Sequence, residues 1–136
     1  VTLAYPEGFD LDPAVIEATK KNCEEADGKF EISHDPYACY DEVDVVYSRH
    51  WMSPRAYQNG EFLKSKEIEL ALKYPEWICD TQKMKRSNNA LFSHPMPVDR
   101  GHEVTDDVAS GNRSIIYDVA ENRLHVQKAI MALTMI

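Results

Sequence analysis

The sequence predicts an α/β fold, an open parallel sheet flanked by helices. Short apolar runs rich in β-branched residues alternate along the 136 residues with longer, more polar helix-like segments. Strands that alternate with helices indicate parallel pairing through right-handed crossovers. A chain of this length is expected to form one domain with a substantial core.

The first half of the chain carries a β-α-β-α-β rhythm. Residues 1–5 form an apolar strand, and Asp12-Pro13 supplies an N-cap and a first-turn proline for a helix that ends near Asp27-Gly28. The third strand is continuously apolar, which predicts burial on both of its faces. The second strand, a helical turn and the third strand are expected at residues 30–33, 36–40 and 43–47.

The second half repeats the alternation and contains one long segment without a pattern. Residues 95–112 show no helical or strand period, and a loop of this length in a compact domain is usually functional. The expected helix, extended piece, capped helical turn, two buried strands and terminal helix span residues 61–73, 77–79, 80–84, 90–93, 114–117 and 120–135.

The composition argues against several classes of partner. A net charge of −8, from 23 acidic and 15 basic residues, would repel nucleic acid and anionic membranes. Cys23, Cys39 and Cys79 lack Cys-x-x-Cys spacing, so we expect neither a disulfide framework nor a zinc site, and a cytoplasmic location. No apolar run approaches the length of a membrane span. The five histidines show no ligand spacing, and we expect no metal and no cofactor.

The segment His94-Pro95-Met96-Pro97 is the most informative motif. Two prolines flank one residue directly after an apolar strand, which stiffens the backbone and removes two N–H donors. The neighbouring carbonyl groups are therefore expected to accept N–H groups from a ligand. With Arg100 and Arg123 nearby in sequence, this turn suits a small ligand that carries an amide and an anion.

Two segments of the chain resemble the carboxyl-terminal half of ornithine/aspartate-type carbamoyltransferases. Where this chain has His94-Pro95-Met96-Pro97, ornithine enzymes carry His-Cys-Leu-Pro and aspartate enzymes carry His-Pro-Leu-Pro. The downstream Arg-Gly-x-Glu-Val-Thr-Asp at 100–106 and the Ala-Glu-Asn-Arg that ends at Arg123 favour the ornithine branch. The resemblance covers most of the chain and is strongest from Trp77 onward.

The resemblance implies one domain of a two-domain carbamoyltransferase subunit. Residues 1–136 would be the amino-acid (ornithine-type) binding domain, incomplete at its amino terminus. The carbamoyl-phosphate domain, with its Ser-x-Arg-Thr-Arg and His-Pro-x-Gln segments, is absent from the chain, so the isolated piece is expected to be inactive. The resemblance further implies a homotrimer of the complete protein, arginine-type metabolism, and a terminal helix that packs toward the carbamoyl-phosphate domain.

The resemblance also implies roles for individual residues. Pro95 and Met96 would orient carbamoyl phosphate through their carbonyl groups, and Arg123 would neutralise its negative charge. His94 is expected either to hydrogen-bond within the site or to brace the turn. The expected catalytic residues are thus His94, Pro95 and Met96, and the expected carbamoyl-phosphate ligands are Pro95, Met96 and Arg123.

The acceptor side departs from the ornithine branch. The expected acceptor-binding residues are Arg49, Trp51, Ser53, Pro54 and Arg100. Arg49 stands where ornithine enzymes carry an aspartate, and an arginine repels an α-ammonium group. Two structural alternatives stay open: Arg49 could pair with Asp44 or Glu42, and Arg100 could pair with an acidic residue of its own loop.

The acceptor is therefore expected to be ornithine or an N-modified ornithine-like amino acid. The pattern after Tyr47 and the stretch at 80–84 are similar to N-acetylornithine enzymes, although that branch carries a lysine in place of Glu103. Two alternatives remain. One is an aspartate-type enzyme, and the other is a non-catalytic paralogue that binds an amino acid or carbamoyl phosphate.

Overall fold

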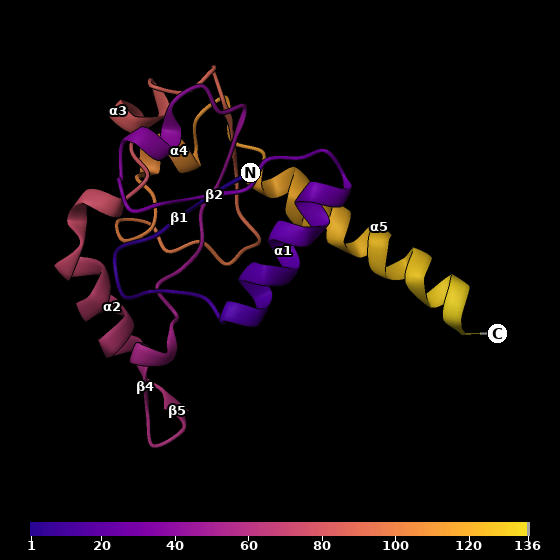
Figure 1. Cartoon of the computed structure of the whole chain (residues 1–136), viewed down its shortest axis with the longest axis horizontal. Helices are drawn as coiled ribbons and strands as arrows, with labels where there is room; N and C mark the ends of the chain where they lie inside the picture. The colour runs from indigo at the N-terminus through magenta and orange to yellow at the C-terminus, as the bar shows by residue number, and fades with distance from the viewer. Residues whose placement is uncertain (136) are drawn as a thin grey trace.

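Two pairs of parallel strands form the centre of the domain in the computed structural model, which describes residues 1–135 (Figure 1). β1 (Thr2–Ala4) pairs with β2 (Glu31–Ser33), and β3 (Val45–Tyr47) pairs with β6 (Leu91–Ser93). Helices lie between the parallel strands along the chain, so the α/β class with parallel pairing that the sequence predicts is confirmed.

Five α-helices and three short 3-10 helices are described within these residues. Two of the α-helices begin at aspartates that act as N-caps: Asp12 accepts from the Ala14 N–H over 2.8 Å, and Asp80 accepts from the Lys83 N–H over 2.8 Å. The α-helices are α1 (Pro13–Glu25), α2 (Lys64–Lys73), α3 (Thr81–Met84), α4 (Asp106–Ala109) and α5 (Ile116–Thr134). The 3-10 helices are η1 (Ala38–Tyr40), η2 (Pro54–Ala56) and η3 (Pro75–Trp77).

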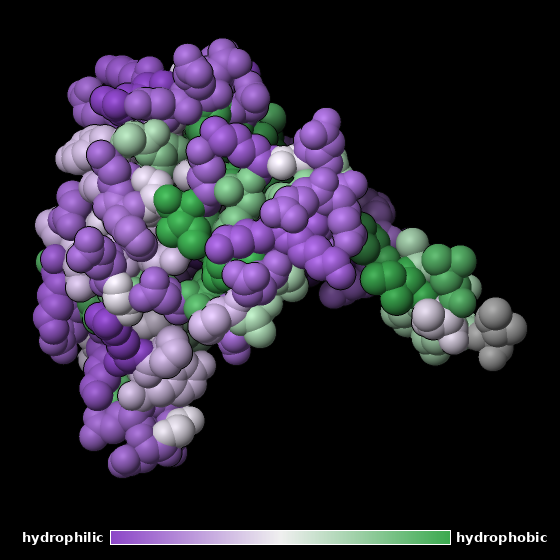
Figure 2. All heavy atoms as spheres, viewed as in Figure 1, coloured by the Kyte–Doolittle hydropathy of each residue, from purple (hydrophilic) through white to green (hydrophobic). Residues whose placement is uncertain are grey.

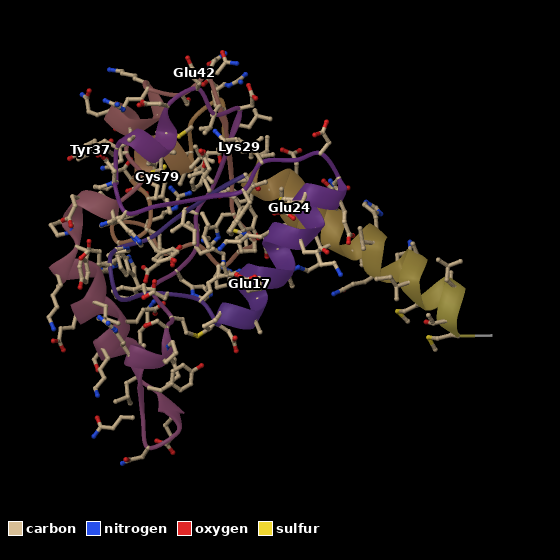
Figure 3. The ribbon with its side chains drawn as sticks, in the orientation of Figure 1. Glu17, Glu24, Lys29, Tyr37, Glu42 and Cys79 are labelled. Atoms are coloured by element: carbon tan, nitrogen blue, oxygen red, sulfur yellow. The ribbon has the colours of Figure 1, made fainter. Side chains whose placement is uncertain are left out.

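The core lies where β6 meets α4 and the start of α5. Phe92 of β6 and Ile116 of α5 are both fully buried, and Cys79 is 1% exposed. Figure 3 shows Cys79 within the body of the domain, whereas Glu17 and Glu24 lie along α1. Burial raises the pKa of the Cys79 thiol to about 11. The buried cluster comprises Tyr40, Cys79, Phe92, Val104, Val108, Ala109 and Ile116.

The expected strand at 114–117 is wrong. Ser114 forms a single bridge with Phe92, and α5 already begins at Ile116. The apolar pair Ile115-Ile116 can pack into the core from a strand or from the first turn of a helix. A short apolar run does not distinguish a strand from a helix start. The long segment 95–112 also contains regular structure, because α4 occupies part of it.

Two further expectations in the first half need correction. The helix expected from residue 61 begins at Lys64, because the chain first forms an antiparallel hairpin of β4 (Tyr57–Gln58) and β5 (Glu61–Phe62). The third strand is not buried on both faces, since Val45 and Tyr47 are 54% and 53% exposed. One face of β3 is therefore uncovered in this chain.

The terminal helix α5 extends away from the body of the domain (Figure 1). Only Ile116 of this helix is buried, whereas Leu124, Ile130 and Leu133 are exposed. Figure 2 shows the resulting apolar surface toward the end of the helix. Within residues 1–135, no helix combines the length and the apolar character that crossing a bilayer requires.

Candidate functional site

The carboxyl ends of β3 and β6 define the candidate site. The register aligns Tyr47 with Ser93, so the residues that follow, Ser48 and His94, leave the strands side by side. Ligands of open α/β sheets bind beyond the carboxyl ends of the strands. The parallel pairing therefore brings together the two sequence motifs that were expected to bind the acceptor and the carbamoyl group.

The double-proline turn has a fixed backbone conformation. Met96, between the two prolines, has a positive φ of 55°, which a residue with a side chain rarely adopts. Its N–H donates to Nδ1 of His94 over 3.0 Å. This local hydrogen bond holds the strained peptide in place, and the His94 ring that accepts it is fully buried.

Arg123 of α5 reaches back to the same turn. One of its terminal N–H groups donates to the Pro95 carbonyl oxygen over 2.7 Å, across 28 residues of sequence. The structure therefore joins two segments that the sequence singled out separately. A carbonyl oxygen has two lone pairs, so the Pro95 oxygen keeps one site for a second donor.

A buried carboxylate lies on the other side of His94. Nε2 of His94 is 2.8 Å from Oε2 of Glu103, which is 4% exposed. The oxygen lies off the direction of the ring N–H, so the contact is close without being a well-aligned hydrogen bond. Burial raises the pKa of Glu103 to about 7, and burial lowers the pKa of His94, with further contributions from His50 and Arg49.

A second set of charges connects α2 to the loop after the turn. Nζ of Lys64 lies 2.7 Å from Oε2 of Glu67 and 2.5 Å from Oδ2 of Asp99. Glu67 is 5% exposed, and its Oε1 lies 4.0 Å from Nδ1 of His50. Asp99 also lies 3.3 Å from the His102 ring. Lys64 thus provides a positive charge for the carboxylates of Glu67 and Asp99.

Arg49 is exposed and forms no ion pair with residues 1–135. Asp44, one of the partners that the sequence offered, accepts instead from the Asn88 side-chain amide over 2.8 Å. The Arg49 guanidinium is therefore available at the carboxyl end of β3.

Trp51, Ser53 and Pro54 shape the segment after β3. Nε1 of Trp51 donates to the His102 carbonyl oxygen over 3.3 Å, and the indole stacks on Tyr74 at 5.7 Å. Oγ of Ser53 accepts from the Arg55 N–H, and Pro54 occupies the first position of η2. These contacts attach the acceptor segment to the loop that carries His102.

Arg100 lies in an ion pair within its own loop. Its guanidinium donates to Oδ1 of Asp106 over 2.8 Å and to Oγ of Ser110 over 2.9 Å. These contacts connect the loop to α4, and the pairing with an acidic residue is the structural alternative that the sequence left open for Arg100. The structure therefore does not direct Arg100 toward the double-proline turn.

Several buried polar atoms lie around the turn. Ser48 Oγ, His50 Nδ1 and His94 Nε2 are inaccessible and have no hydrogen-bond partner among residues 1–135. An unpaired buried polar group costs about 1–3 kcal/mol and is uncommon away from functional sites. His50 follows a predicted strand, and that position alone could have indicated that it lies at the site. No pattern in the sequence indicates that Glu67 and Glu103 are buried.

A hollow of about 410 Å³ lies at the opposite, amino-terminal end of β6. Thr81 and Met84 of α3 line one side, and Val108 and Gly111 line the other. The double-proline turn contributes nothing to this hollow, and its walls contain none of the buried unpaired atoms. The turn is therefore the better candidate for the chemistry.

Comparison with known proteins identifies similar domains. Residues 1–134 match the family model described as aspartate/ornithine carbamoyltransferase, Asp/Orn binding domain. The chain is 38% identical over 135 residues to an ornithine carbamoyltransferase of Thermococcus kodakarensis, covering 99% of this chain and 41% of that protein. It is 38% identical over 133 residues to an N-acetylornithine carbamoyltransferase of Xanthomonas campestris pv. campestris, covering 97% of this chain and 38% of that protein.

Solved structures give the same result. A crystal structure of N-acetyl-L-ornithine transcarbamylase superposes with a TM-score of 0.82 at 38% identity, covering 97% of this chain and 39% of that one. A crystal structure of acetylornithine transcarbamylase complexed with acetylcitrulline gives a TM-score of 0.83 at 36% identity, with the same coverage. The chain spans about two fifths of the length of the relatives that it matches.

Proposed function

Because the chain belongs to the aspartate/ornithine carbamoyltransferase family, we propose that the complete protein transfers the carbamoyl group of carbamoyl phosphate to an amino acid. The acceptor would be the side-chain amine of ornithine or of an N-modified ornithine-like amino acid. Residues 1–136 would supply the amino-acid-binding domain, and a carbamoyl-phosphate domain would lie elsewhere in the complete protein. The complete protein would act as a cytoplasmic homotrimer.

The contact between Arg123 and the Pro95 carbonyl oxygen is the observation that carries this proposal. Carbamoyl transfer requires an electrophile that is oriented and a negative charge that is neutralised. The Pro95 and Met96 carbonyl groups would accept from the carbamoyl NH2 group, and the adjacent guanidinium would offset the charge of the phosphate and of the developing oxyanion. No covalent intermediate with the protein is needed.

The steps of the reaction follow from this arrangement. The neutral acceptor amine attacks the carbamoyl carbon, and the carbonyl oxygen becomes an oxyanion. Collapse of the tetrahedral intermediate expels phosphate, which takes the proton released by the attacking nitrogen, and leaves a ureido product. The protein contributes orientation and electrostatic stabilisation, and one well-aimed charge-assisted donor lowers such a barrier by about 2–4 kcal/mol.

The unpaired Arg49 supports an acceptor that lacks a free α-ammonium group. An exposed guanidinium at the carboxyl end of β3 would repel the ammonium and attract an anionic or carbonyl substituent. Trp51, Ser53 and Pro54 would form the adjoining wall of the acceptor site. Arg100 would stabilise the loop rather than contact the acceptor, given its bonds to Asp106 and Ser110.

An aspartate-type activity is the second candidate. It is favoured by Arg49, which could bind a substrate carboxylate, and by Pro95 in place of the cysteine of ornithine enzymes. The test is formation of ureido product by the complete protein from carbamoyl phosphate and ornithine, N-acetylornithine, N-succinylornithine or aspartate. Turnover with an acylated ornithine supports the proposal, and turnover with aspartate alone selects the second candidate. Binding of substrates without product would identify a non-catalytic paralogue.

A further inference from the structure

His94 has no open face toward a ligand. The ring is fully buried, Nδ1 accepts the Met96 N–H, and Nε2 faces the Glu103 carboxylate. A ring that is inaccessible to solvent cannot donate a proton to a substrate or take one from it in this arrangement. Its effect on the site must therefore pass through the groups that it contacts.

We propose that Glu103 is a positioning residue for carbamoyl phosphate, acting through His94 on the Met96 peptide. The inference rests on the proposed function, because the Pro95 and Met96 carbonyl groups are the ones proposed to orient the carbamoyl group. The His94–Glu103 pair lies behind the turn, and the strained Met96 conformation depends on the hydrogen bond to Nδ1.

The hydrogen bond from Met96 determines the tautomer of the His94 ring. Nδ1 of His94 accepts from the Met96 N–H, so a neutral ring carries its proton on Nε2. Nε2 lies 2.8 Å from Oε2 of Glu103, off the direction of the ring N–H, and the same oxygen accepts from the Asp99 N–H over 3.2 Å. Only an acceptor at Glu103 is compatible with this tautomer. The opposite tautomer would set the Nδ1 proton against the Met96 N–H and release the turn.

The pair is sensitive to protonation because Glu103 is buried. Protonation of Glu103 removes the negative charge beside His94 Nε2, and burial brings this step close to neutral pH. Carbamoyl phosphate recognition should therefore weaken as the pH falls through about 7. The charged and titratable groups that face Glu103 or His94 are Asp99, Glu67, Lys64, His50 and Arg49.

Two substitutions in the complete protein test the role of Glu103. Glu103→Leu removes the acceptor at similar volume, and we expect the KM for carbamoyl phosphate to rise on the order of tenfold, with a smaller change in kcat. Glu103→Gln is neutral like the protonated carboxyl group, so its KM should match the low-pH value of the wild type and should no longer change near pH 7. Glu69→Leu and Glu69→Gln are matched controls at an exposed glutamate paired with Lys73.

An unchanged KM in a folded Glu103→Leu variant would overturn the proposal. If that variant fails to fold, wild-type pH dependence of KM in Glu103→Gln would overturn it instead. Nitrogen-15 NMR of the histidine rings gives a readout that needs no turnover: we expect His94 protonated on Nε2, and protonation on Nδ1 would contradict the pairing. If the wild type forms no ureido product, the proposed function fails while the NMR result still decides the pairing.

Discussion

The Arg123 guanidinium donates to the Pro95 carbonyl oxygen over 2.7 Å, so the last helix is attached to the double-proline turn. The contact places a permanent positive charge beside the carbonyl groups proposed to hold the carbamoyl group. It also attaches α5 to the domain, although Ile116 is the one buried residue of that helix among those described.

Replacement of Arg123 by glutamine should lower kcat/KM for carbamoyl phosphate about 10²- to 10³-fold, because a charge-assisted donor to the oxyanion and phosphate is lost. The measurement is steady-state kinetics of the complete protein. Lys128→Gln removes an equal charge from the same helix and should leave the kinetics unchanged. A similar loss in both variants would show that only the net charge of α5 matters.

Arg49→Asp should shift acceptor preference toward free ornithine. The exposed guanidinium is unpaired among residues 1–135, and an aspartate there would attract the α-ammonium group that the arginine repels. The ratio of kcat/KM for ornithine to that for N-acetylornithine should rise about 10-fold or more. Lys20→Asp on α1 makes the same change in net charge far from the site. Unchanged acceptor selectivity in Arg49→Asp would refute the charge argument.

The parts of the fold that follow from local patterning were predictable. Asp12 and Asp80 each begin a helix as expected, and the α/β class follows from the alternation of elements. The β4–β5 hairpin was missed, although Asn59-Gly60 is the standard signal for such a turn and both residues have positive φ. The strand expected at 114–117 failed because periodicity cannot separate short buried strands from the start of a buried helix.

The candidate site was predictable only where a motif marks it. The double-proline turn and Arg123 each belong to a recognisable segment, and the structure brings them together. Glu67 and Glu103 read as ordinary charged residues in the sequence, since lone carboxylates are usually solvated. Their burial depends on tertiary contacts with Lys64 and His94. A local sequence pattern does not predict such contacts.

Removal of the Asp80 carboxylate should destabilise the domain strongly. Asp80 caps α3 and lies 3.1 Å from Nζ of Lys83, whose side chain is 2% exposed. Asp80→Ala would leave a buried ammonium without its carboxylate, at a cost of about 3–5 kcal/mol including the lost cap. Chemical denaturation of the complete protein measures this loss. Lys83→Met in the same protein should recover most of it, and an additive double variant would contradict the coupling.

The same pair gives a stability change with a defined pH direction. Burial opposes ionisation of Asp80, but hydrogen bonds from the Lys83 backbone and side chain outweigh it and lower the pKa of the carboxyl group. A lowered folded-state pKa contributes stability above the unfolded value of about 3.9, and this is lost as the pH falls through the folded value. The free energy of unfolding should therefore fall less on acidification in Asp80→Ala than in the wild type. An equal fall in both proteins would show that other carboxylates cause the acid destabilisation.

The exposed apolar face of α5 predicts a contact in the complete protein. Ile130 and Leu133 are 54% and 77% exposed in this domain, and apolar residues repeated along a projecting helix are usually covered by another surface. If α5 packs against the proposed carbamoyl-phosphate domain, Ile130→Asp should lower the free energy of unfolding by about 2–4 kcal/mol. Gln127→Asp supplies the same charge on the same helix at an already polar position. A change within about 0.5 kcal/mol for Ile130→Asp would show that the helix remains solvated, because surface substitutions rarely exceed that value.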